Sequence, residues 1–467
     1  MTAPLWTAFE IAAAVDGEVH GSFDANGVAF DSREIGPGDL FVALSGETTD
    51  GHRFLDRAYA AGAAGAIVSE AADGPHVRVA DTMAALNALG AAARARMPGK
   101  VIGVTGSVGK TGTKEALFAC LDRATPGRVH RSVKSYNNHT GVPLSLARMP
   151  ADTRIGVFEM GMNHAGELAG LTRLVRPHVA IVTAIAPAHS AFFASEAEIA
   201  DAKGEIFQGL EPGGIAIIPN DSPHRDRLMA AAKPHAARIL TFGMTRDADI
   251  HAQEVIPLEK GTLVSLILPD AELTFTIAPP GDHWVSNAMA VIGAVWAVGG
   301  DLAAAGLAFA EMEGLPGRGQ RSRVAAGDGA ALVIDESYNA NPASMAATIK
   351  VLGEERAKRR IVVLGEMREL GAGSADFHAA LARPLVEANV DYALLVGPEM
   401  AALANALEGR IDFAHVADAG AALDSIEALI APGDAILVKG SNAIGLSRLV
   451  ERLRSRGEAV ERTSCST

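Results

Sequence analysis

The stretch from Val101 to Glu115, Val-Ile-Gly-Val-Thr-Gly-Ser-Val-Gly-Lys-Thr-Gly-Thr-Lys-Glu, decides the fold of this chain. An apolar strand runs here into a glycine-rich turn that ends in Lys110 and Thr111. Small residues let backbone N–H groups close on phosphate oxygens, the lysine adds a positive charge, the threonine hydroxyl can hold Mg²⁺, and the following helix offers its positive N-terminus. The full pattern needs glycine where the chain has Val104, so a variant nucleotide-binding loop is predicted, with a purely structural turn as the alternative. The residues expected to hold the nucleotide are Gly106, Ser107, Val108, Gly109, Lys110, Thr111 and Gly112.

Length and charge limit the function classes. The chain has 467 residues and a formal net charge of −14. The length predicts about three domains of ~150 residues each, and the charge disfavours a nucleic-acid or anionic-membrane partner. Anionic ligands must therefore be bound by local clusters of cations. The two cysteines, Cys120 and Cys465, offer neither a disulfide framework nor a metal site, which is typical of the reducing cytoplasm.

No targeting or membrane segment is expected. The N-terminus lacks a basic segment followed by an apolar core. The longest apolar run, residues 288–300, is stopped by Asp301 and is shorter than the ~18 residues that suggest a membrane span. This run predicts a buried helix in a cytoplasmic protein, which we expect to be a monomer.

The chain divides into three blocks, predicted as domains of residues 1–98, 99–314 and 315–467. An alanine-rich helix over 83–97 ends at Pro98-Gly99, and a second group of chain breakers, residues 314–319, forms a linker. Apolar strands alternate with helices in the second and third blocks, which predicts parallel, doubly wound sheets. The tail after about residue 456 is expected to be frayed. The strands are expected at 101–104, 155–158, 180–185 and 215–218, then at 331–334, 361–364, 393–396 and 435–438, with one helix over about 285–312.

Polar residues follow several of these strands. Glu159, His189 and Asn220-Asp221 fall at or just beyond the carboxyl ends of predicted strands in the second block. Ligands of open α/β sheets bind at those ends. Glu159 therefore suits Mg²⁺ coordination, directly or through water, rather than simple solvation.

At this point the motifs together resemble the Mur ligases. Several ordered motifs at compatible spacing are far more specific than one phosphate loop, and they cover nearly the whole chain. The motifs are Thr105-Gly-Ser-Val-Gly-Lys-Thr111, Asn137-Asn138, Gly141-Val-Pro-Leu144, Glu159-Met-Gly-Met-Asn163, Ala202-Lys-Gly-Glu-Ile-Phe207 and Asp335-Glu-Ser-Tyr-Asn-Ala-Asn-Pro342, with Asp31-Ser-Arg33, Gly38-Asp-Leu-Phe-Val-Ala43, Asp50-Gly-His52, Leu364-Gly-Glu-Met367 and Val438-Lys-Gly-Ser441.

The resemblance implies a three-domain α/β ligase with a small N-terminal domain, a phosphate-loop ATPase-like centre and a Rossmann-like C-terminal domain. It implies ATP and Mg²⁺ as cofactors and an acyl phosphate that an amine displaces. The run that starts at Asp335 favours the members that join D-alanyl-D-alanine to UDP-N-acetylmuramoyl-tripeptide in peptidoglycan precursor synthesis. Such chemistry needs cations and oriented donors more than a protein nucleophile.

The resemblance also implies roles for two residues to which the sequence alone would assign no function. Lys203 would be carbamylated by CO₂ and become an anionic ligand for a second Mg²⁺, whereas a lone helix lysine is ordinarily a solvated charge. His189 would lie near this second metal, with a buried structural histidine as the alternative. The segment after it, residues 190–195, lacks the carboxylate that the family usually has there.

The remaining site residues follow motif by motif. The catalytic group is expected to be Lys110, Glu159, His189 and Lys203, and the metal ligands are Thr111, Glu159 and carbamylated Lys203. Nucleotide contacts are also expected from Asn287, Arg318 and Asp335, and a hinged closure of the third domain over ATP follows. Substrate contacts are expected from Ser32, Arg33, Ser45, Gly46, His52, Asn138, Tyr338 and Asn339.

Two departures and two alternatives remain at this stage. Gly112 stands where the family usually has serine or threonine, and Trp284 stands where asparagine is common, next to His283. One alternative is a related amide ligase, such as the enzyme that adds the third amino acid or the one that lengthens folate glutamate tails. The other is a phosphate-loop binding module without ligase activity, which would leave Lys203 and the third block unexplained.

Overall fold

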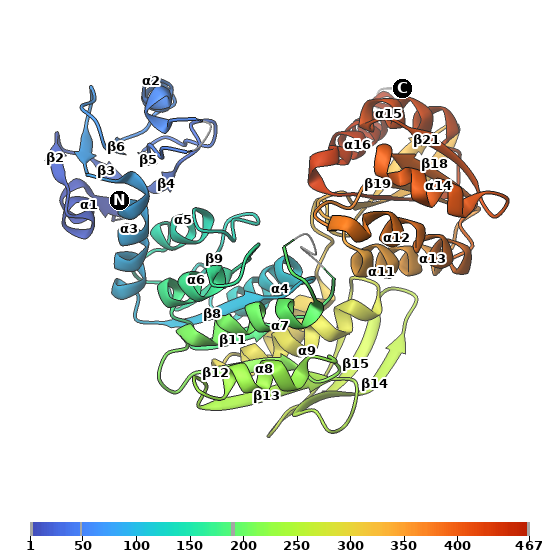
Figure 1. Cartoon of the computed structure of the whole chain (residues 1–467), viewed down its shortest axis with the longest axis horizontal. Coiled ribbons are helices and arrows are strands. Elements are labelled where there is room, and N and C mark those ends of the chain that lie inside the picture. The colour runs from blue at the N-terminus through green and yellow to red at the C-terminus, as the bar shows by residue number, and fades with distance from the viewer. Residues whose placement is uncertain (1–2, 47–48, 188–191, 465–467) are drawn as a thin grey trace.

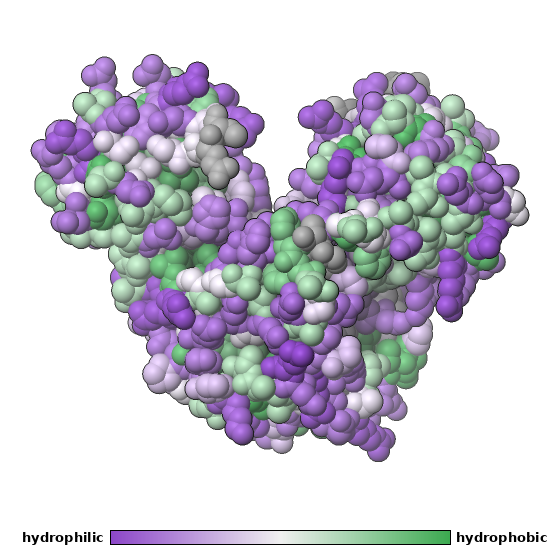
Figure 2. Space-filling view, in the orientation of Figure 1, coloured by the Kyte–Doolittle hydropathy of each residue, from purple (hydrophilic) through white to green (hydrophobic). Residues whose placement is uncertain are grey.

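The computed structural model describes residues 3–46, 49–187 and 192–464. The chain forms three α/β domains in a row, each built around a main sheet of its own. Figure 1 shows the N-terminal and C-terminal domains standing apart on the central domain, and Figure 2 shows the open hollow between them. The predicted three-domain α/β fold is confirmed, whereas the boundaries after residues 98 and 314 stay predictions.

The N-terminal domain has a five-stranded sheet in the order β2-β7-β6-β5-β4, in which β4 to β7 run parallel and β2 pairs antiparallel with β7. Its core extends onto the central domain, because Leu144 and Ala147 of helix α5 (Gly141–Ala147) belong to the same buried cluster. The Trp6 indole N–H also donates to the Ala147 carbonyl at 2.8 Å. The elements are β1 (Trp6–Thr7), α1 (Ala8–Val15), β2 (Glu18–His20), β3 (Asp24–Ala25), β4 (Gly27–Ala29), β5 (Asp39–Val42), η1 (Gly51–Phe54), α2 (Leu55–Ala60), β6 (Gly65–Val68), β7 (His76–Arg78) and α3 (Thr82–Arg96).

The central domain has a nine-stranded sheet in the order β16-β15-β14-β13-β12-β11-β8-β10-β9. The four predicted strands, β8, β10, β11 and β12, are present and parallel. Strands β9, β13 and β14 extend this parallel sheet and were not predicted. Strand β15 pairs antiparallel with β14, and β16 pairs antiparallel with β15, which was not predicted either. The elements are β8 (Lys100–Thr105), α4 (Lys110–Ala124), β9 (Val129–Arg131), α5 (Gly141–Ala147), β10 (Ile155–Glu159), α6 (Glu167–Val175), β11 (Val179–Val182), α7 (Glu196–Gly204), η2 (Glu205–Gly209), β12 (Ile215–Pro219), α8 (Arg225–Ala232), β13 (Arg238–Gly243), β14 (Ile250–Pro257), β15 (Thr262–Ile267), β16 (Glu272–Ile277), α9 (Asp282–Ala297) and α10 (Leu302–Ala310).

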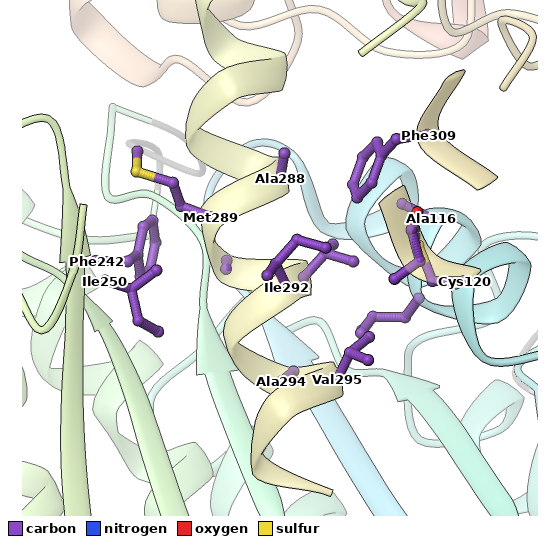
Figure 3. Close-up of a cluster of buried hydrophobic side chains, with 14 of the residues drawn as sticks. Ala116, Cys120, Phe242, Ile250, Ala288, Met289, Ile292, Ala294, Val295 and Phe309 are labelled. Atoms are coloured by element: carbon purple, nitrogen blue, oxygen red, sulfur yellow. Dashed lines mark hydrogen bonds between the residues drawn. The ribbon is translucent and has the colours of Figure 1, made fainter. Parts of the chain in front are cut away.

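Helix α9 is the buried helix that the apolar run predicted. Figure 3 shows Ile292 and Val295 turned toward Cys120 of α4 and Phe309 of α10, with sheet residues on the other side. The single helix expected over 285–312 is wrong, because the chain breaks between α9 and α10 at Gly299, which has φ +74°. In the part of the chain that the structure describes, no helix is long and apolar enough to cross a bilayer.

The C-terminal domain has a six-stranded sheet in the order β17-β18-β22-β19-β20-β21, parallel except for β17. All four strands predicted here are present. The tail expected to fray lies in the second half of α16. Strand β11 ends at Val182, three residues before the predicted end at 185. The elements are β17 (Gln320–Ala326), β18 (Gly329–Glu336), α11 (Pro342–Gly353), β19 (Arg359–Gly365), η3 (Gly371–Gly373), α12 (Ser374–Ala379), α13 (Ala382–Glu387), β20 (Tyr392–Val396), η4 (Pro398–Met400), α14 (Ala401–Leu407), β21 (Asp412–Val416), α15 (Ala419–Leu429), β22 (Asp434–Lys439), η5 (Asn442–Ile444) and α16 (Leu446–Ser464).

Candidate active site

The glycine-rich turn between β8 and α4 has the geometry of an anion cradle. Gly106 and Gly109 have φ of +149° and +85°, which glycine adopts without the Cβ strain of other residues. A Cβ on Gly106 would lie 2.0 Å from Thr183 Oγ1, and one on Gly109 would lie 2.8 Å from Asn287 Oδ1. Helix α4 begins directly after this turn, so its positive N-terminus adjoins the cradle.

Lys110 folds back into the cradle. Its Nζ donates to the Gly106 carbonyl at 2.7 Å, a position that a phosphate oxygen would compete for. Burial lowers the pKa of Lys110, and the negative charge of Glu159 opposes that shift. An ammonium held in such a site is a strong partner for an anion, because little water screens it.

The first helical turn of α4 meets the end of β10 at a carboxylate. Thr111 Oγ1 donates to Glu159 Oε2 at 2.8 Å, and Asn137 Nδ2 donates to Glu159 Oε1 at 2.8 Å. Glu159 is buried, with 1% of its surface exposed. Hydroxyl and carboxylate oxygens are the ligands that Mg²⁺ takes from proteins, usually one or two per ion together with substrate phosphates. Among the described residues, no three His, Cys, Asp or Glu side chains gather as a metal site.

Lys203, near the end of α7, is a fully buried amine that has no hydrogen-bond partner among the described residues. Burial lowers its pKa well below the ordinary value, and the positive charge of Lys110 lowers it further, while Glu159 opposes the shift. Lys203 therefore lies close enough to Lys110 and Glu159 to feel the charge of both. An unpaired buried amine is rare and unfavourable in proteins. His189, the fourth predicted catalytic residue, lies outside the described residues.

The C-terminal domain reaches this site through its linker. Arg318 Nη2 donates to Ser135 Oγ at 3.3 Å, and its guanidinium lies 4.3 Å from the centre of the Tyr338 ring. Asp335, at the end of β18, accepts from Gly317 N at 2.8 Å and from Ser337 Oγ at 2.6 Å. Arg318 is thus beside the phosphate loop, whereas the Asp335 carboxylate is occupied in shaping the linker.

A cavity lies between the central and C-terminal domains next to Arg318. Burial lowers the pKa of His283 to about 4 and the positive charge of Lys439 adds to that shift, so His283 is neutral at pH 7. Burial raises the pKa of Glu336, and the positive charges of Lys439 and Arg318 oppose the shift. A mainly apolar wall with a few polar groups suits a heteroaromatic ring. The lining residues include Pro279, Pro280, His283, Trp284, Arg318, Ile334, Glu336 and Val351.

The predicted substrate residues of the N-terminal domain do not all present free groups. Arg33 is well exposed and forms a two-oxygen ion pair with Asp31, with Nη2 at 2.5 Å from Oδ2. This hydrogen bonding lowers the pKa of Asp31 to about 2. Both ring nitrogens of His52 are in use, since Nδ1 lies 2.6 Å from Asp50 Oδ1 and Nε2 accepts from Ser69 N at 2.9 Å. His52 therefore links two segments of the N-terminal domain through its ring.

The other predicted substrate residues are turn and strand-end residues. Ser32 is buried, and Ser45 pairs with Asp50 in an isolated bridge beside Gly46. Asn138 Oδ1 accepts from Gly141 N at 2.9 Å and so fixes the turn before α5. Asn339 offers its carbonyl to Lys439 Nζ at 2.8 Å. Their substrate roles stay predictions.

One loop at the site was missed by the sequence argument. Residues 132–138, between β9 and α5, place Ser135 beside Thr111 and Asn137 on Glu159. The same loop reaches the N-terminal domain, because Lys134 Nζ and Tyr136 Oη lie 2.6 and 2.8 Å from Glu34 Oε1. The Asn-Asn pair was the available signal, but nothing local reveals contacts between residues a hundred positions apart.

Comparison with known proteins places this geometry in a family. Family models match residues 24–101 (Mur ligase family, catalytic domain), 104–295 (Mur ligase middle domain) and 317–442 (Mur ligase, glutamate ligase domain). The UDP-N-acetylmuramoyl-tripeptide–D-alanyl-D-alanine ligase of Escherichia coli is 35% identical over 449 residues, covering 95% of this chain and 97% of that protein.

Solved structures agree. A crystal structure of MurF from Acinetobacter baumannii has a TM-score of 0.83 at 32% identity, covering 96% of this chain and 99% of that one. MurF ligase from Thermotoga maritima in complex with ADP has a TM-score of 0.76 at 25% identity, covering 93% of this chain and 98% of that one. Three successive domain matches and a relative that is 35% identical along almost the whole chain show that the protein belongs to the Mur ligase family.

Proposed function

We propose that this chain is an ATP-dependent ligase that joins D-alanyl-D-alanine to UDP-N-acetylmuramoyl-tripeptide in the cytoplasm, giving the pentapeptide precursor of peptidoglycan. The observation that carries the proposal is the 35% identity to a ligase of that name over 95% of this chain. The phosphate cradle with Lys110 and the Thr111–Glu159 pair supports it independently, because both suit a nucleotide triphosphate.

The reaction has two displacements. A carboxylate oxygen of the tripeptide attacks the γ-phosphorus of ATP and ADP leaves, which gives an acyl phosphate. The amine of D-alanyl-D-alanine then attacks the acyl carbon, phosphate leaves, and the amine nitrogen loses a proton. Lys110 and Arg318 would neutralise charge on the transferring phosphoryl group, which is where such enzymes gain most of their rate.

Thr111 and Glu159 would hold Mg²⁺, which would neutralise charge on the triphosphate. Lys203 would contribute in a modified form. Its lowered pKa favours a neutral amine, whose nitrogen can add to dissolved CO₂, lose a proton and become a carbamate. A carbamate reverses the sign of charge at this position and supplies oxygen ligands for a second Mg²⁺.

The test is phosphate release from ATP, followed in a coupled assay. Release is expected to need Mg²⁺, UDP-N-acetylmuramoyl-tripeptide and D-alanyl-D-alanine together, because an acyl phosphate turns over only when an amine traps it. Equal turnover with free D-alanine or with glutamate would refute the assignment. Turnover with UDP-N-acetylmuramoyl-dipeptide and a diamino acid, in place of the tripeptide and D-alanyl-D-alanine, would favour the third-residue ligase instead.

A further inference from the structure

Lys114, one helical turn beyond Lys110, is a buried cation that the proposed reaction does not use. It has no exposed surface. Its Nζ donates to the Ser132 carbonyl at 3.1 Å and to the Lys134 carbonyl, and it lies 2.9 Å from Glu115 Oε1. Three ammonium donors thus meet three acceptors. Glu159 Oε2 lies 4.0 Å from the same nitrogen.

Burial of this ammonium costs desolvation free energy, so its contacts call for a physical explanation. Burying an ammonium is unfavourable unless every donor is satisfied and an opposite charge is near. Here Glu115 supplies that charge and is itself fixed on the other side by Arg131, with Nε 2.8 Å from Glu115 Oε2. An apolar side chain would fill the space without this desolvation cost. What it would not do is hold the two loop carbonyls.

The loop so held, residues 132–138, contacts residues of all three domains. Ser132 Oγ accepts from Glu159 N at 3.1 Å, and Asn137 Nδ2 donates to Glu159 Oε1. Ser135 contacts Arg318 of the C-terminal linker, and Lys134 pairs with Glu34 of the N-terminal domain. Lys134 has φ +50°, a strained conformation for a residue other than glycine, and its carbonyl is one of the two that Lys114 binds.

We propose that Lys114 is a positioning residue that fixes the 132–138 loop through the Ser132 and Lys134 carbonyls. The loop in turn holds Glu159, Arg318 and the N-terminal domain in the positions that the reaction needs. Lys114 itself touches no substrate. The inference rests on the proposed function for its kinetic consequence, whereas the order of the loop can be measured without any turnover.

The first experiment is hydrogen exchange of the ligand-free protein, comparing wild type with Lys114→Met. Amides of residues 132–138 are expected to lose protection in the variant, while amides of β12 and β13 keep theirs. Lys233→Met is the matched control, because Lys233 is exposed on the same domain and no change in either region is expected. Unchanged protection of 132–138 in a folded Lys114→Met protein would overturn the proposal, whatever the enzyme's activity.

The second experiment is kinetic. Lys114→Met is expected to lower kcat about 100-fold, the size produced by a misplacement of about 1 Å, and to raise the Mg²⁺ concentration needed for half-maximal rate. A merely structural lysine would lower the melting temperature and leave the kcat of the folded fraction and its Mg²⁺ requirement unchanged. If wild type has no ligase activity, the proposed function fails, and the exchange experiment still decides the role of Lys114.

A third variant covers the case in which Lys114→Met does not fold. Glu115→Gln keeps the ammonium and an oxygen acceptor but removes the negative charge that orients it. It is expected to fold, with partly lost protection at 132–138 and a kcat lowered about 10-fold. Wild-type protection and wild-type kcat in Glu115→Gln would count against the proposal in that case.

Discussion

Gly112 of α4 lies directly against the indole of Trp284 in α9: a Cβ on Gly112 would be 3.2 Å from Trp284 Cη2. Both positions were noted from the sequence as departures from the usual Mur ligase pattern. A serine at 112 would press on the ring, and an asparagine at 284 would leave the space above Gly112 unfilled. The two positions therefore pack against each other, and Trp284 also lines the interdomain cavity.

A double-mutant cycle tests whether Gly112 and Trp284 are energetically coupled. Gly112→Ser is expected to cost about 1 to 3 kcal/mol by overpacking, and Trp284→Asn about 3 kcal/mol by loss of buried surface. The double variant should be more stable than the sum predicts, by at least about 0.5 kcal/mol, because each change relieves the other. The measurement is denaturant unfolding of the four proteins. Strict additivity would show that the two positions are independent.

The sequence predicted the parts of the site that are local in the chain. The cradle before Lys110 and the carboxylate at the end of β10 follow from a motif and from the rule that strand ends bind ligands. The sequence did not reveal Lys114, because its acceptors are carbonyls of another segment. The β14–β16 extension was missed for a similar reason: alternation predicts a strand but not its partner. The two glycines before Asp301 were available as a sign that α9 ends early.

Lys110→Ala should lower kcat/KM for ATP at least ~10³-fold, about 4 kcal/mol of transition-state stabilisation, because the ammonium neutralises charge that builds on the phosphates. Steady-state phosphate release is the measurement. The half-buried ammonium contacts a single loop carbonyl closely, that of Gly106, so its loss is expected to leave the fold intact, as circular dichroism can verify. A decrease of less than tenfold would mean that the cradle does not act in catalysis.

Arg33→Ala should raise KM for the UDP substrate about tenfold, about 1.4 kcal/mol, and leave KM for ATP and for D-alanyl-D-alanine near wild type. The reason is that Arg33 lies in the N-terminal domain and pairs there with Asp31, so its loss should affect only the substrate assigned to that domain. Arg78→Ala is the matched control, because Arg78 also pairs with an acid on the surface of that domain, at 2.5 Å from Glu18, and no KM should change. A rise in KM for ATP would show that the domain has been misassigned.

Lys203 offers the sharpest separation of stability from activity. Its amine is buried and has no hydrogen-bond partner in the part of the chain that the structure describes. Lys203→Met, which nearly keeps the length of the side chain and removes this nitrogen, should therefore leave the melting temperature unchanged or higher in CO₂-free buffer. The same variant should lose at least about 100-fold in kcat, because it cannot supply an anionic ligand. Thermal unfolding and phosphate release, measured on one preparation, decide both points.

The chemical identity of the group at Lys203 can be tested by the sign of its charge. Depletion of CO₂ should lower the activity of the wild type and bicarbonate should restore it, because a carbamate forms only while CO₂ is present. Lys203→Ala should be inactive and regain part of its activity with short carboxylic acids, which can bring a carboxylate into the vacated space. Lys203→Arg keeps a positive charge that repels a metal, so it should stay impaired under every one of these conditions. A fully active arginine variant would show that no carbamate forms at this position and that a second Mg²⁺, if bound, takes other ligands.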